Sequence, residues 1–126
     1  MAGAPKDASG SLSEPQLNPR QLRLTRSLDF RRAYNSGRKL RVSSAIIFLL
    51  KNAAGQLRLG VTVTRKVGNA VRRNRLKRQV REIFRRHSAS LNPGWDIVVN
   101  VKPEAARMAY SEMERDLLSA IGRAMR

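Results

Sequence analysis

The residues best suited to chemistry form a dense series of cations in the middle of the chain. Ten of the 26 Lys and Arg residues lie between positions 65 and 86, together with a single acid, Glu82. Arginine binds phosphate through two parallel N–H donors, so such a series is typical of proteins that contact nucleic acid. The ten cations are Arg65, Lys66, Arg72, Arg73, Arg75, Lys77, Arg78, Arg81, Arg85 and Arg86.

The same stretch has an apolar pattern that predicts a helix rather than an unstructured basic tail. Apolar side chains recur close to helical spacing and would form one buried stripe. Asn69 is suited to cap the first turn, and no proline follows until Pro93. Like charges three and four residues apart on the remaining surface repel unless an anion neutralises them, which favours a polyanionic partner. The expected stripe is Val71, Leu76, Val80, Ile83 and Phe84.

The whole composition agrees with a small nucleic-acid-binding protein. The chain has 126 residues, a formal net charge of +17 and 41% hydrophobic residues, enough for one domain with a modest core. It has no cysteine, and its longest apolar run, residues 45–50, is far too short to span a bilayer. No secretory signal pattern occurs in the first 19 residues. We therefore expect a cytoplasmic protein that has no membrane partner.

The order of predicted elements indicates an α+β fold. Residues 1–19 are rich in Ala, Gly, Ser and Pro and are expected to form a disordered N-terminal extension, whereas residues 20–126 form the α/β domain. A short helix is expected over residues 28–36, capped by Ser27 and ended by Gly37. Strands are expected over residues 42–50 and 57–64, joined as a hairpin by a turn at 52–55, with a further short strand possible nearby.

The second half of the chain completes this pattern. A strand over residues 95–101 follows the basic helix and is expected near the centre of the sheet. A final amphipathic helix starts at the capping-box spacing of residues 111–114. The predicted architecture is a single-domain α–β sandwich with three helices, a mixed sheet of about four strands and a β-α-β crossover through the basic helix. It resembles the architecture of small ribosomal proteins.

The sequence offers few groups for catalysis by the protein itself. His87 is the only histidine and has no sequence neighbour suited to a dyad or triad. No group of His, Asp and Glu has metal-ligand spacing, and no phosphate-binding glycine loop occurs. We expect no catalytic residue and no protein-bound metal.

The segment GNAVRRNRLKRQVRE resembles the signature of the bacterial ribonuclease P protein component. The core of that signature corresponds here to Arg73-Asn74-Arg75 followed by Lys77-Arg78. LDFRRAYNSGRK, at residues 28–39, resembles the first helix of the same family. The family usually has Lys-Lys before the Gly-Asn turn, whereas this chain has Arg65-Lys66.

The resemblance implies two RNA-binding surfaces. One would contact the catalytic RNA of ribonuclease P, and the other would hold the 5′ leader of precursor tRNA, where aromatic rings stack on bases. The first would comprise Arg65, Lys66, Asn69, Arg72, Arg73, Asn74, Arg75, Lys77, Arg78 and Arg81. The second would comprise Phe30, Tyr34, Arg38, Phe48, Thr62 and Thr64.

The resemblance also implies where the reaction takes place. In that family the RNA subunit carries the active site and its Mg²⁺ ions, and the protein assists endonucleolytic removal of the leader.

The composition leaves two alternatives open. A ribosomal structural protein has the same size and charge, and a protein-only nuclease would need the fold to gather the scattered Asp29, Asp96 and Asp116 around a metal.

Overall fold

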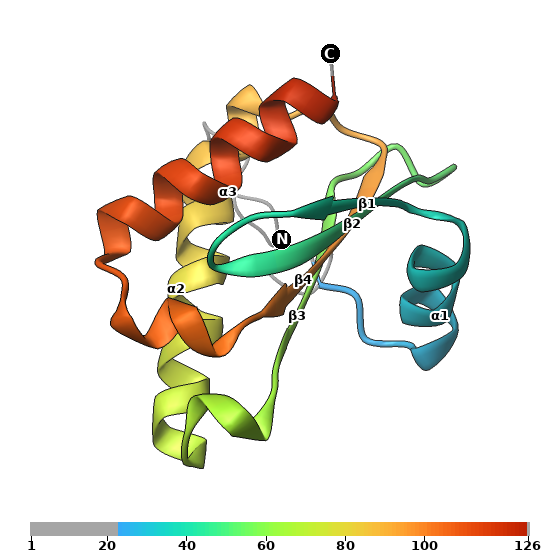
Figure 1. The fold of residues 1–126 in the computed structure, drawn as a ribbon. Helices are drawn as coiled ribbons and strands as arrows, with labels where there is room; N and C mark the ends of the chain where they lie inside the picture. Colours follow the sequence, from blue (N-terminus) through green and yellow to red (C-terminus); the bar gives the residue numbers. More distant parts are fainter. Residues whose placement is uncertain (1–22, 126) are drawn as a thin grey trace, which may run out of the picture.

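The computed structural model describes residues 23–125, so the extension expected at residues 1–19 lies outside the described part of the chain. One mixed sheet is covered on one face by α2 (Ala70–His87) and α3 (Tyr110–Ala124), while α1 (Ser27–Ser36) lies on the other face (Figure 1). The strands are β1 (Arg38–Arg41), β2 (Ala45–Lys51), β3 (Arg58–Val63) and β4 (Trp95–Val101). This architecture confirms the expected sandwich of three helices and a four-stranded sheet.

The strand order is β1-β2-β4-β3, which confirms the crossover and corrects the hairpin. β3 and β4 run parallel and are connected through α2, as expected. The predicted hairpin of the strands at 42–50 and 57–64 is wrong, because β4 lies between them and pairs antiparallel with β2. The four residues Asp96, Ile97, Val98 and Val99 of β4 are all buried, and only an inner strand has neighbours on both sides and cover on both faces.

The real hairpin joins β1 and β2. The short extra strand anticipated near this position is β1, and it pairs antiparallel with β2. The strand expected over residues 42–50 corresponds to β2, and its expected start is wrong, because the chain turns at residues 42–44 and β2 begins at Ala45. Ser44 is buried in this turn, where its hydroxyl donates to the Asp116 carboxylate at 2.8 Å and its backbone N–H donates to the same oxygen at 3.0 Å.

The first helix, α1, starts and ends differently from the expectation. Ser27 lies inside α1, and Arg26 is the N-cap without a side-chain hydrogen bond. Gly37 follows the helix with a φ of −78°, so it is not in the left-handed conformation. Its lack of a side chain still matters, because a Cβ there would stand 2.4 Å from the Ala33 carbonyl oxygen.

The last helix, α3, begins at Tyr110 rather than after Ser111. Its N-cap is Ala109, which has no side-chain acceptor, so only half of a capping box is present. That half is the Glu112 carboxylate, which accepts the Ala109 N–H at 2.8 Å.

The main core lies between the sheet and the pair α2 and α3. Four residues of the expected α2 stripe are buried in it, namely Leu76, Val80, Ile83 and Phe84. Val71 was wrongly assigned to the stripe: it is 73% exposed, because the first turn of α2 projects past the packed part of the sheet (Figure 1). A smaller cluster lies under α1 and contains Leu24, Ala33 and Val98. Within residues 23–125, no helix is both long and apolar enough to cross a bilayer.

Candidate nucleic-acid interface

The cations of α2 are available at the surface because the apolar residues of this helix face the core. The Asn69 side chain accepts the Arg72 N–H at 3.0 Å, which confirms Asn69 as the cap and fixes where the helix begins. Arg72, Asn74, Arg75 and Arg78 are exposed. The row Arg73, Lys77 and Arg81, spaced four residues apart, is half-buried along the flank of the helix.

Two of the residues predicted to bind the catalytic RNA, Asn69 and Arg73, make hydrogen bonds within the protein. The Asn69 side-chain oxygen is occupied by the helix cap. The guanidinium of Arg73 donates to the Gly68 carbonyl at 2.8 Å and so braces the turn that precedes α2. Gly68 has a φ of +147°, a conformation that favours glycine. Part of the signature thus builds the turn and the helix start, and its neighbours provide the free cations.

The turn before α2 extends the charged surface. Arg65 and Lys66 lie in a short 3-10 helix, Arg65–Val67, whose Val67 is buried in the main core. Both cationic side chains are exposed. The anchored Val67 therefore holds Arg65 and Lys66 next to the first turn of α2.

A second surface lies on the opposite face of the sheet, where the three predicted aromatic residues meet. The ring centroids of Phe30 and Tyr34 are 6.5 Å apart, and those of Tyr34 and Phe48 are 4.9 Å apart in an edge-to-face arrangement. Tyr34 is 39% exposed, whereas Phe30 and Phe48 are half-buried against the cluster under α1. The face of Tyr34 is thus the most accessible of the three.

Polar groups continue this surface along β3 and β4. Asn100 of β4 lies beside Thr62 of β3 in the parallel register. The Asn100 side-chain oxygen accepts hydrogen bonds from the Thr62 hydroxyl at 2.6 Å and the Tyr34 hydroxyl at 3.1 Å. The network ties α1 to both strands and orients the Tyr34 ring. Sequence reasoning missed Asn100, because its place beside Thr62 depends on strand order.

One residue predicted for this surface, Arg38, does not join it, and another, Thr64, lies just past the end of β3. Arg38 points to the opposite face of the sheet, where its guanidinium donates to the Ala124 carbonyl of α3 at 3.4 Å. Thr64 is exposed and is the N-cap residue of the 3-10 helix that follows β3. The neighbour of Arg38, Lys39, lies on the aromatic face instead, with its ammonium 5.9 Å from the centroid of Phe48. Once residues 38–41 are known to form a strand, the alternation of its side chains places Lys39, rather than Arg38, on the aromatic face.

An ion-pair cluster holds α1 against the sheet. Arg58 of β3 donates two hydrogen bonds of 2.8 Å to Asp96, a carboxylate that is only 1% exposed. Asp96 also accepts from Asn52 at 2.7 Å, and Asp29 of α1 lies 3.8 Å from the Arg58 guanidinium. The hydrogen bond to Asp96 raises the pKa of Arg58 above its ordinary value. Two of the scattered aspartates, Asp29 and Asp96, are therefore drawn together by an arginine.

The single histidine is part of a surface contact between α2 and α3. The His87 Nε2 atom lies 2.7 Å from the Glu114 carboxylate, and Arg86 lies 3.8 Å from the same group. Within residues 23–125, no three His, Asp or Glu side chains are grouped in a way that could hold a metal ion.

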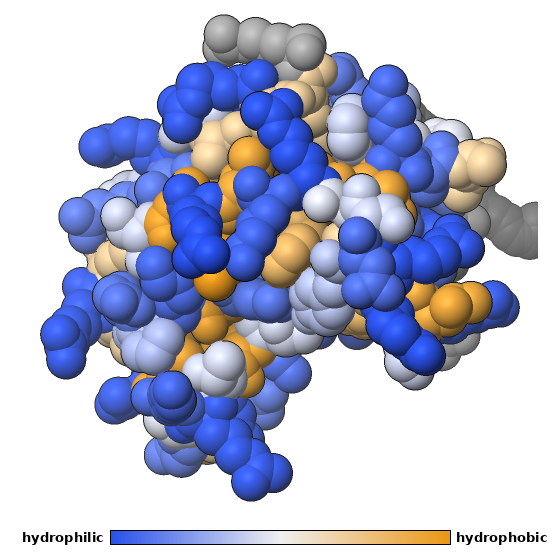
Figure 2. Space-filling model, turned by 45° about the vertical axis from the view of Figure 1, so that its right-hand side comes forward, coloured by the Kyte–Doolittle hydropathy of each residue, from blue (hydrophilic) through white to orange (hydrophobic). Residues whose placement is uncertain are grey.

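Seen from the side that carries α1, hydrophilic side chains dominate the surface and separate small hydrophobic patches (Figure 2). Only three large hydrophobic residues of the described chain are exposed: Leu28, Tyr34 and Val71. A surface of this kind suits a polar, charged partner more than an apolar protein interface.

Comparisons with known proteins place this chain in one family. A family model described as Ribonuclease P matches residues 18–125. The chain is 42% identical over 95 residues to the ribonuclease P protein component of Desulfosudis oleivorans, covering 75% of this chain and 78% of the relative. It is 40% identical over 114 residues to that of Desulfovibrio desulfuricans, covering 87% and 88%.

Solved structures agree with the sequence comparison. The RNase P protein of Thermotoga maritima superposes with a TM-score of 0.74 at 36% identity, covering 80% of this chain and 96% of that one. The RNase P protein of Staphylococcus aureus gives a TM-score of 0.76 at 30% identity, covering 82% and 94%.

Proposed function

The chain belongs to the family of ribonuclease P protein components, and we propose that it binds the catalytic RNA through α2 and the 5′ leader of precursor tRNA through the aromatic face. Membership in this family makes it a protein subunit of ribonuclease P with an RNA partner. It also removes the ribosomal structural protein as an alternative. The division of labour between the two surfaces is the proposal.

The observation that carries the proposal is the division of α2 between core and surface. Its buried residues are all apolar, and its remaining surface carries cations with Glu82 as the only acid. Arg85 binds Glu82 through contacts of 2.6 and 3.2 Å, so that acid is already hydrogen-bonded to one arginine of the helix. Phosphate groups of a folded RNA would relieve the repulsion among these side chains and accept their hydrogen bonds.

The aromatic face has the properties needed to hold a single strand. Any base can stack on an aromatic ring, so binding would tolerate many leader sequences. Tyr34 offers the accessible ring, and Lys39 supplies charge for the backbone phosphates. Phe48 lies beneath Tyr34 and supports it. The leader would contact the sheet on the face opposite to α2, so one domain would bind both RNAs without competition.

The protein would contribute binding and charge screening rather than catalytic groups. Mg²⁺ prefers oxygen ligands, and the side chains at both proposed surfaces are largely cationic or aromatic. This supports placement of the catalytic Mg²⁺ ions and the cleavage step in the RNA subunit. By neutralising phosphates where substrate and RNA meet, the protein would lower the Mg²⁺ concentration that assembly requires.

The test is cleavage of a 5′-extended precursor tRNA at low Mg²⁺ by the cognate ribonuclease P RNA, with and without the protein. We expect strong stimulation that requires the RNA, and no cleavage by the protein alone. If stimulation is absent at low Mg²⁺ while the RNA cleaves normally at high Mg²⁺, the proposal is wrong.

A further inference from the structure

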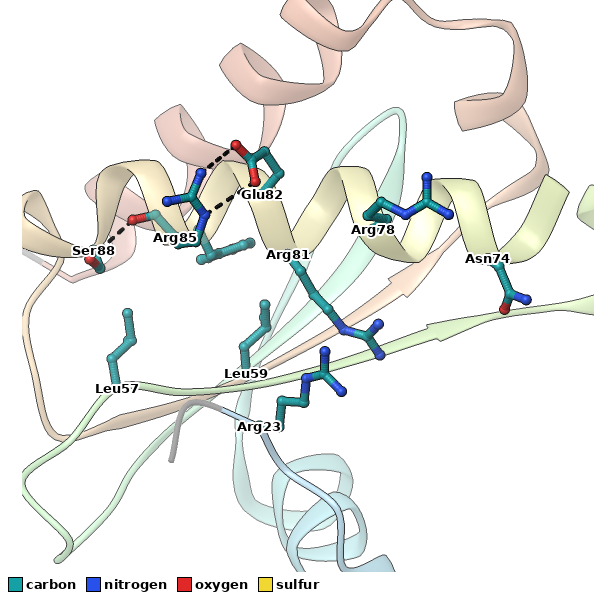
Figure 3. A pocket seen from close by; sticks show the side chains of 10 residues that line it. Arg23, Leu57, Leu59, Asn74, Arg78, Arg81, Glu82, Arg85 and Ser88 are labelled. Atoms are coloured by element: carbon teal, nitrogen blue, oxygen red, sulfur yellow. Dashed lines mark hydrogen bonds and ion pairs between the residues drawn. The ribbon is translucent and has the colours of Figure 1, made fainter. Parts of the chain in front are cut away.

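A cavity of about 530 Å³ lies between β3 and α2, on the side of the sheet away from α1. β3 is an edge strand, so one side of the cavity is open to solvent. Its floor is apolar and is formed by Leu57, which precedes β3, with Leu59 of β3 and Phe84 of α2. These three side chains are 7%, 8% and 3% exposed, so only their edges border the cavity. In Figure 3 the two leucine side chains rise from the strand towards the helix. The volume lies within the range of small-ligand sites.

The segment before α1 closes part of this edge and brings an arginine to the cavity. The backbone N–H of Leu24 donates to the Leu59 carbonyl at 2.9 Å, and Arg23 forms a parallel bridge with Leu59. Arg23 thereby lines the cavity opposite α2. Figure 3 shows the Arg81 guanidinium extending from α2 towards that of Arg23. Two residues that lie 58 positions apart in the sequence (81 − 23) thus direct their charges to one place.

The cavity has an excess of positive charge. Four arginines line it with a single acid, Glu82, and Figure 3 shows that acid bound to Arg85 on the far side of the helix from Arg23. No acidic side chain within residues 23–125 forms an ion pair with Arg23 or Arg81. Burial, and then the charge of Arg23, lower the pKa of Arg81. An arginine remains charged at neutral pH, so the two guanidinium groups repel unless an anion lies between them.

The combination of paired guanidinium groups and an apolar floor matches one class of ligand. The phosphate group of a nucleotide accepts hydrogen bonds from both guanidinium groups. The base of the same nucleotide would lie with its flat face against the leucines and Phe84. Inorganic phosphate would bind the two guanidinium groups alone and make no contact with the leucines.

We propose that this cavity binds an unpaired nucleotide of the RNA partner, with its phosphate held between Arg23 and Arg81 and its base against Leu57, Leu59 and Phe84. The inference rests on the proposed function, because it assumes that α2 docks on RNA. It adds a defined subsite to that surface and assigns a role to Arg23, which lies outside the signature.

The test is a double-mutant cycle in the full-length chain bound to ribonuclease P RNA. R23Q and R81Q keep the side-chain stems, and R26Q serves as the matched control because Arg26 is an exposed arginine of the same segment. We expect R23Q and R81Q each to weaken binding about tenfold, since each removes hydrogen bonds to a charged group. Because both hold one phosphate, the double variant should lose less than the product of the two effects.

The salt dependence and the fold provide separate readouts. The slope of log affinity against log salt should decrease by roughly 0.7 to 0.9 in either variant and little further in the double variant. R26Q should leave affinity and slope unchanged, and urea unfolding should be alike in all variants. Strictly additive effects, or wild-type affinity of R23Q, would overturn the shared phosphate site.

A second arm separates a nucleotide from a bare anion. Uridine monophosphate and inorganic phosphate are titrated against the protein, and NMR follows the Arg81 Nε–H and the Leu57 and Leu59 methyl groups. We expect the nucleotide to shift all three residues and phosphate to shift the arginine alone. Equal shifts with both probes would overturn the base contact. If R72A/R75A still weakens RNA binding while R23Q does not, the subsite fails and the proposed function stands.

Discussion

The ring of Phe30 in α1 lies directly over Gly60 in β3. A Cβ at residue 60 would stand 2.6 Å from the Phe30 Cζ atom and 3.2 Å from the Leu24 Cβ atom. The distance to the Phe30 ring is shorter than real Cβ contacts allow. The absence of a side chain at residue 60 therefore lets α1 approach the sheet. That approach places Tyr34, one turn after Phe30, within hydrogen-bonding distance of Asn100.

Gly60→Ala should displace α1 and weaken leader binding. The new methyl group would overlap the Phe30 ring, so we expect a loss of about 1–3 kcal/mol in the free energy of unfolding. Urea unfolding measures this loss. Gly122→Ala is the matched control, because a Cβ there meets nothing within 4 Å and lies in α3. It should stabilise the protein by about 0.5–1 kcal/mol. Equal behaviour of the two variants would contradict the contact.

Tyr34→Ala and Phe30→Ala should separate RNA binding from folding. Tyr34 is the accessible ring, so its loss should weaken binding of precursor tRNA to the holoenzyme more than binding of mature tRNA. Stability should fall only modestly, through loss of the hydrogen bond to Asn100 and the contact with Phe48. Phe30 packs on Gly60 and should mainly lower stability, by less than the roughly 3–5 kcal/mol of a fully buried Phe. Filter binding and thermal unfolding provide the two readouts. Equal losses for precursor and mature tRNA in Tyr34→Ala would remove it from the leader site.

Arg72→Ala with Arg75→Ala should weaken binding to ribonuclease P RNA and leave the fold intact. Both side chains are exposed on α2, in contrast to Arg73, which also braces Gly68. If each contacts one phosphate, the salt slope should fall by roughly 0.7 to 0.9 for each residue. Arg107→Ala with Arg115→Ala, two exposed arginines elsewhere, removes the same charge and is the control. Similar losses in both double variants would indicate nonspecific charge attraction.

Asp96→Ala should be strongly destabilising. It removes the carboxylate that accepts from Arg58 and Asn52 and leaves the Arg58 guanidinium poorly paired, so we expect a loss of about 3–5 kcal/mol. Glu82→Ala, which removes the exposed partner of Arg85, should leave the urea midpoint unchanged. A mild effect of Asp96→Ala would mean that water or Asp29 replaces the lost carboxylate.

Local features of the fold were predictable because short-range chemistry determines them. The Asn69 cap, the buried part of the α2 stripe and the bounds of β4 follow from residues close together in sequence. The order of the strands was not predictable in this way, because the pairing of β2 with β4 joins segments about 50 residues apart and depends on which strand is buried on both faces. The hairpin was therefore assigned to the wrong pair.

The same distinction applies to the candidate surfaces. The cations of α2 were identified because one helix carries them all. Arg38 was assigned to the wrong face, since the register of a short strand decides which side each residue takes. Asn100 and Arg23 were missed because their partners, Tyr34 and Arg81, belong to other segments. The structure alone brings these pairs together.

The central place of β4 also has a consequence for how the protein is made. During synthesis β2 and β3 leave the ribosome before β4, yet each pairs with β4 and neither pairs with the other. Until residue 101 has emerged, both strands expose unpaired backbone groups on a chain that already carries the cations of α2. Both proposed RNA surfaces depend on this one late insertion. A nascent chain arrested before β4 would therefore attract RNA by charge alone, and selective binding would begin only when the last strand completes the sheet.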